Sequence, residues 1–76
     1  MKKRFKLVFP QNLIREPILF TLVKAYDVMP NIRRARVTET VAEIVVDITG
    51  EEENIDLAIQ ALKKQGVDAE ITEAAE

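Results

Sequence analysis

Asparagine and arginine side chains gather in one short stretch of the chain, at Asn31, Arg33, Arg34 and Arg36. A guanidinium group suits bidentate recognition of a carboxylate, and an amide can bind the ammonium or carboxylate group of an amino acid. The stretch therefore has the chemistry of a carboxylate or anion site. Two other interpretations remain open. The charges could protect an exposed strand edge from unwanted pairing, or the strand could join a twofold copy so that Arg36 faces Glu39.

Several residue types that catalysis commonly requires are missing. The 76 residues include no histidine, cysteine, serine or tryptophan. Without cysteine and histidine there is no thiolate or imidazole to hold zinc, and no disulfide or iron–sulfur cluster can form on this chain. Without serine and cysteine the usual nucleophiles are absent too. We therefore expect no enzyme, no catalytic residues and no cofactor.

The acidic residues that gather near the middle of the chain have a structural explanation. Glu51, Glu52, Glu53 and Asp56 fall at the predicted start of a helix, where negative charge interacts favourably with the helix dipole. Contiguous carboxylates on a helix do not converge on one cation as the ligands of a loop do. No metal site is expected.

Length and composition indicate one globular domain over residues 1–76. Hydrophobic residues make up 47% of the chain and charged residues 32%. No apolar run approaches the 18 or so residues of a membrane-spanning helix, and the first residues do not resemble a secretory signal. We expect a soluble, cytoplasmic protein without membrane insertion.

Hydrophobic periodicity predicts four strands and two helices. Alternating apolar residues place strands at about 3–10, 31–39, 42–49 and 67–72, and apolar stripes at spacings of three and four place helices at about 16–28 and 52–65. Pro17 suits the first turn of the first helix, and Gly66 suits a left-handed cap after the second. Right-handed crossovers then give an α+β, ferredoxin-like βαββαβ two-layer sandwich with sheet order 4-1-3-2 and one open face.

The predicted topology determines how the uneven distribution of charge along the chain is interpreted. Residues 1–36 hold nine Lys and Arg but two Asp and Glu, whereas residues 37–76 hold two and eleven. The predicted sheet interleaves the two halves, so acidic and basic strands alternate across the open face and compensate one another. The aromatic residues fall at or beside core positions. We therefore expect no nucleic acid partner, because such binding favours an uncompensated basic stripe with exposed aromatics.

The chain resembles a NIL domain over residues 3–71. Asn31-Ile32 stands where the family has its Asn-Ile-Leu signature, with Arg33 in place of the leucine. Further matching features are the first strand ending at Phe9, Glu16-Pro17-Ile18, Tyr26-Asp27-Val28, Gly50, Ile55 with Ala58-Ile59 and Leu62, and Gly66-Val67.

The resemblance implies a ferredoxin-like fold and a function. NIL domains stand at the C-terminus of methionine-import ABC ATPases, where they bind methionine and inhibit transport, and they also occur fused to ferredoxin-type clusters. This chain would be a free-standing member: a non-catalytic regulatory module that binds methionine or a related amino acid. The implied site lies around Asn31 and Ile32. Ile32 and Val37 would form an apolar slot, and Asn31 and Arg33 would supply polar contacts.

Two questions about partners remain open. A weak homodimer could form through the second strand, because that strand is an unpaired edge of the predicted sheet. The alternative function is a protein-interaction adaptor that docks on a metabolic enzyme, a transporter or a ferredoxin partner.

Overall fold

The computed structural model describes residues 1–14 and 17–72 of the chain. Its elements are β1 (Lys2–Phe9), the 3-10 turn η1 (Gln11–Leu13), α1 (Ile18–Tyr26), β2 (Met29–Val37), β3 (Ala42–Thr49), α2 (Glu52–Lys64) and β4 (Asp68–Thr72). This order confirms the predicted βαββαβ arrangement.

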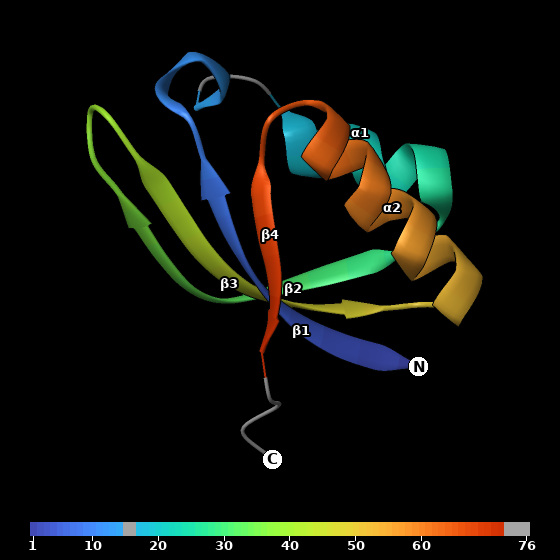
Figure 1. The fold of residues 1–76 in the computed structure, drawn as a ribbon. Helices are drawn as coiled ribbons and strands as arrows, with labels where there is room; N and C mark the ends of the chain where they lie inside the picture. The colour runs from blue at the N-terminus through green and yellow to red at the C-terminus, as the bar shows by residue number, and fades with distance from the viewer. Residues whose placement is uncertain (15–16, 73–76) are drawn as a thin grey trace.

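The four strands form one antiparallel sheet in the order β2-β3-β1-β4. This is the predicted order 4-1-3-2 counted from the other edge. Figure 1 shows both helices on one side of the twisted sheet, with the tip of the β2–β3 hairpin extending beyond them. The other face of the sheet is open, so the fold is the expected two-layer α+β sandwich.

The core lies between the helices and the sheet. From Phe5 onward, every second residue of β1 is buried there, at Phe5, Leu7 and Phe9, because successive side chains of a strand point to opposite faces. The two helices close this layer with apolar residues at helical spacing: Ile18 and Leu22 from α1, and Ile55, Ala58, Ile59 and Leu62 from α2.

The observed boundaries differ most from prediction around β2. The first helix was predicted over 16–28 but runs over Ile18–Tyr26, and residue 16 lies outside the described residues. It ends because Asp27 takes the left-handed conformation, with φ of 55°, while its N–H donates to the carbonyl of Val23 at 3.0 Å. The strand then begins at once, through Pro30, which an edge strand tolerates because its missing donor faces no partner.

The predicted second strand also extended too far, to residue 39. It ends at Val37, because Thr38 closes a turn with Val41. The Thr38 N–H donates to the Val41 carbonyl at 2.8 Å, and the Thr38 hydroxyl oxygen accepts the N–H of Val41 at 3.1 Å. Glu39 therefore lies in the turn and not in the strand. β2 also begins at Met29, two residues before the predicted start at 31, and the other boundaries lie within one residue of prediction.

A bulge interrupts β2 at Arg33. Ile32 pairs with Val46 of β3, and Arg34 pairs with its neighbour Val45, so Arg33 is the additional residue. The bulge switches the alternation of side chains. Pro30, Ile32, Ala35 and Val37 share the helix-facing side, and Asn31, Arg34 and Arg36 share the open face.

No helix among the described residues is long and apolar enough to cross a membrane.

Candidate functional site

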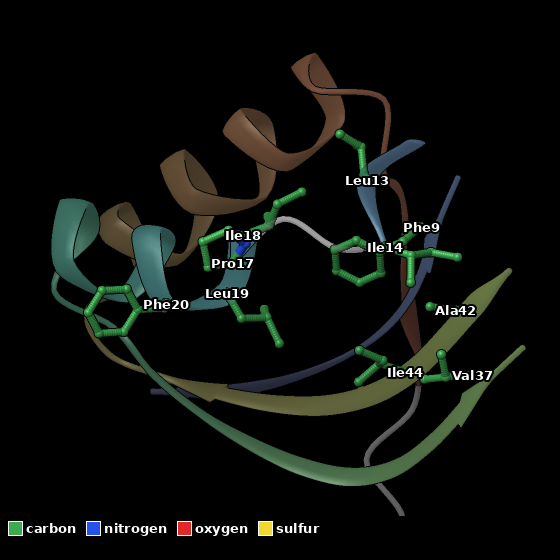
Figure 2. Close-up of a pocket in the computed structure, with 10 residues that line it drawn as sticks. All are labelled: Phe9, Leu13, Ile14, Pro17, Ile18, Leu19, Phe20, Val37, Ala42 and Ile44. Atoms are coloured by element: carbon green, nitrogen blue, oxygen red, sulfur yellow. The ribbon is translucent and has the colours of Figure 1, made fainter. Parts of the chain in front are cut away.

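An apolar cavity of about 210 Å³ opens between the start of α1 and the hairpin ends of β2 and β3. In Figure 2, Leu19 approaches it from the helix, Ile44 and Val37 approach from the sheet, and Phe9 lies between them. The described residues that line it are Phe9, Leu13, Ile14, Pro17, Ile18, Leu19, Phe20, Val37, Ala42 and Ile44. Because these side chains carry no charged or hydrogen-bonding groups, the cavity suits an apolar group.

The turn η1 and the hairpin end of β2 form opposite rims of the cavity. Pro10 begins the turn η1, whose Leu13 N–H donates to the Pro10 carbonyl at 2.9 Å. The turn brings Leu13 and Ile14 over the edge of the core, where they are partly buried. Val37 lies on the opposite rim and is 60% exposed. The rim is thus made by segments that are far apart in sequence.

The structure separates the four residues of the predicted ligand site. Val37 lines the cavity, and Ile32 lies on the same helix-facing side but does not reach the lining. Asn31 lies on the open face, because it pairs with Asp47, and Arg33 also approaches Asp47 there. Of the four, Val37 alone is therefore among the described residues that line the cavity. Of the other lining residues, the sequence indicated Leu13 and Ile14, two apolar loop residues that could line a pocket or plug the end of the core; both line the cavity.

A buried carboxylate organises the open face. Asp47 is 2% exposed and accepts two hydrogen bonds from Arg4, from Nε at 2.6 Å and from a terminal guanidinium nitrogen at 3.1 Å. Arg33 contributes a third nitrogen at 3.9 Å. The Arg4 hydrogen bond holds the pKa of Asp47 below its ordinary value, against the opposing effect of burial, and the charges of Arg4, Arg33 and Lys2 act in the same direction as the hydrogen bond.

The charge compensation expected across the open face is incomplete. Both carboxylates of β3 turn toward β1: Asp47 pairs with Arg4, and Glu43 pairs with Lys6 at 3.1 Å. Among the described residues, Arg34 and Arg36 of β2 form no ion pair within 4.0 Å. Two shallow grooves run beside these arginines. One of about 350 Å³ is lined by Lys6, Arg34, Arg36, Glu43 and Val45, and one of about 300 Å³ is lined by Arg4, Arg33, Arg34 and Val45.

The acidic start of α2 has a local partner. Lys3 lies 3.6 Å from Glu52 and 3.4 Å from Asp56, so a β1 cation meets the first turns of the helix. In the part of the chain that the structure describes, no three acidic side chains come together as metal ligands would.

Comparison with solved structures identifies relatives of the fold. The C-terminal domain of an ABC transporter ATP-binding protein from Enterococcus faecalis superposes with a TM-score of 0.81 at 27% identity, covering 97% of this chain and 86% of that one. Prephenate dehydratase from Streptococcus mutans gives 0.62 at 17% identity, covering 92% and 40%. The designed protein Foldit4 gives 0.59 at 16% identity, covering 96% of each chain. The last two show a shared fold alone.

Sequence comparison gives the family. A search of curated proteins returns no match. Residues 3–71, nearly the whole chain, match the sequence profile of the NIL domain. The independently predicted topology and the similarity to an ABC transporter domain agree with this match. The chain therefore belongs to the NIL domain family.

Proposed function

We propose that this chain is a non-catalytic regulatory module of the cytoplasm that binds methionine or a related amino acid. The observation that carries the proposal is the apolar cavity beside Val37. Support also comes from the family and from the similarity to the C-terminal domain of an ABC transporter ATP-binding protein. A transport ATPase or an enzyme of sulfur amino-acid metabolism is the class of protein that such a module would regulate.

The size and lining of the cavity favour a small ligand with an apolar end. Its volume of about 210 Å³ is smaller than the roughly 300–1,000 Å³ typical of sites for drug-sized ligands. A thioether is apolar and flexible, so it can fill an irregular space between Leu19 and Ile44. The ammonium and carboxylate groups would stay at the open rim near Val37. We expect weak affinity, with Kd on the order of 10 μM to 1 mM, or about 4 to 7 kcal/mol.

We propose separately that two copies of the chain can pair through β2. β2 is an outer strand of the described sheet, and residues 31–37 are all exposed. The predicted contact between Arg36 and Glu39 of a copy needs Glu39 in the strand, and the strand ends at Val37. We therefore propose that the homodimer forms within Pro30–Val37 instead. The same edge would serve an adaptor function if a different protein occupied it.

The test compares two exposed apolar residues on opposite edges of the helix-facing side. Val37→Glu places a charge at the cavity rim. Ile71→Glu is the matched control, because Ile71 is 61% exposed on β4 and pairs with Phe5 away from the cavity. A thermal-shift panel of free amino acids should show stabilisation by methionine in the wild type and in Ile71→Glu, and none in Val37→Glu.

One further variant distinguishes this site from the family signature. Asn31 lies on the open face, away from the cavity. Methionine should therefore stabilise the Asn31→Ala variant as much as the wild type. Loss of the methionine effect in Asn31→Ala with retention in Val37→Glu would move the site to the Asn31–Arg33 segment. No stabilisation of the wild type by any amino acid would leave the adaptor function as the better account.

A further inference from the structure

We propose that a small multivalent oxyanion, such as phosphate or pyrophosphate, binds between two copies of β2 and controls their pairing. The inference rests on the homodimer of the proposed function, but it does not depend on methionine binding. It follows from three features of β2: the exposed edge, the bulge at Arg33, and a row of arginines of which Arg34 and Arg36 form no ion pair within 4.0 Å among the described residues.

The exposed edge offers both backbone and apolar side chains. No described strand lies outside β2, so the outward N–H and C=O groups of the strand are open to a second chain. Pro30 has no N–H to donate, so at this position the paired edge has the Pro30 carbonyl alone. On the helix-facing side, Ile32 is 51% exposed and Val37 is 60% exposed. Antiparallel pairing with a copy would cover both.

The bulge selects the register of such a pair. Paired residues of neighbouring strands point to the same face of a sheet. The bulge switches the alternation of side chains along β2. As a result, there is a twofold register in which paired residues of the two copies lie on the same face along the whole of Pro30–Val37. In it Val37 lies opposite Pro30 of the second copy, and Ile32 lies opposite Ala35. In this register the bulges meet at the twofold axis, and Arg33 lies opposite Arg34 of the second copy.

Among the described residues, the charges at this axis are only partly neutralised. Four guanidinium groups would meet there, and like charges directly opposite one another destabilise strand pairing. β3 cannot compensate them, because Glu43 pairs with Lys6 and Asp47 pairs most closely with Arg4, leaving Arg33 a contact of 3.9 Å. An anion with several charged oxygens would accept hydrogen bonds from the arginines of both copies. The net electrostatic interaction between the copies would then be attractive and no longer repulsive.

The geometry favours a small free anion over nucleic acid. The groove of about 300 Å³ beside Arg33 and Arg34 would open toward the axis from each copy. Among the described residues, the pairing register places no aromatic side chain on the open face for bases to stack on. The acidic residues of β4, Asp68 and Glu70, limit the basic surface on its far side.

Sedimentation velocity on the intact chain tests the proposal. Protein is compared in chloride, phosphate and pyrophosphate at one pH and one ionic strength. We expect monomer in chloride and a dimer at least about tenfold tighter in pyrophosphate, with phosphate intermediate. The double variant Arg33→Leu, Arg34→Ala should dimerise to the same extent in all three buffers. Lys63→Ala, Lys64→Ala on α2 is the charge-matched control and should behave as the wild type.

Other outcomes would overturn the proposal. The first is a dimer that is as tight in chloride as in pyrophosphate. The second is a monomer in every buffer. The third is dimerisation of the arginine double variant that still depends on the anion. A single-stranded oligonucleotide that promotes association where pyrophosphate does not would identify the surface as a nucleic acid site instead. Methionine binding is measured separately, in chloride, by the thermal shift of the monomer. The failure of either proposal can thus be recognised without the other.

Discussion

At the scale of single residues, Asp47 is a buried carboxylate that joins Arg4 of β1 and Arg33 of β2 on the open face of the sheet. Arg4 donates two hydrogen bonds to its carboxylate, and these favour the ionised form and lower its pKa. Since the folded pKa is lowered, the stabilisation from this group is fully present above the unfolded pKa of about 3.9, and it is lost as the pH falls through the folded value.

The prediction is that Asp47→Asn lowers the urea midpoint at pH 7, and that the difference from the wild type narrows below about pH 4. Asp68→Asn, an exposed carboxyl on the same face, is the control and should stay within about 0.5 kcal/mol of the wild type at pH 7. Equal stability of Asp47→Asn and the wild type at pH 7 would mean that the Arg4 pair contributes nothing to folding.

Asp27 offers a second test at this scale, because it is the described non-glycine residue with positive φ. A left-handed conformation costs an L-residue about 1–2 kcal/mol, less for aspartate, and glycine avoids the cost. Asp27→Val should therefore be about 1–2 kcal/mol less stable than Asp27→Gly in urea unfolding. Similar stabilities would show that the helix end relaxes to another conformation.

At the scale of elements, each helix is held by the stripe that it buries and not by its exposed face. On α2, Leu62 is fully buried, whereas Leu57 is 48% exposed. Leu62→Ala should cost about 2–5 kcal/mol through lost burial and the cavity left behind, and Leu57→Ala should cost less than about 1 kcal/mol. Thermal unfolding of the pair measures this difference, and comparable losses would contradict the assigned face.

The elements also show where sequence reasoning succeeds. The strict alternation of Ile44, Val46 and Ile48 predicted β3 to the residue, and the stripe of Ile55, Ala58, Ile59 and Leu62 predicted α2. These signals are local. The bulge at Arg33 and the end of β2 were not predictable in this way, because they depend on the register against β3 and on the hydrogen bonds of Thr38.

At the scale of the whole molecule, the cavity is the feature that local patterns could not reveal. Its walls come from segments between Phe9 and Ile44 that meet only after the sheet has formed. The charge distribution illustrates the same limit. Topology predicted the alternating strands correctly. Only side-chain contacts show that both carboxylates of β3 pair with β1, and that Arg34 and Arg36 form no ion pair within 4.0 Å among the described residues.

The central claim, that this NIL domain holds a methionine-like amino acid beside Val37, is tested most directly by NMR. Methionine is titrated to several millimolar into nitrogen-15-labelled protein in chloride buffer, with alanine as the control amino acid. The account predicts saturable shifts of the backbone amides of Phe9, Val37, Ala42 and Ile44 with methionine, and much smaller shifts with alanine. Shifts confined to Asn31–Arg33, or no shift anywhere between Asn31 and Ile44, would contradict it.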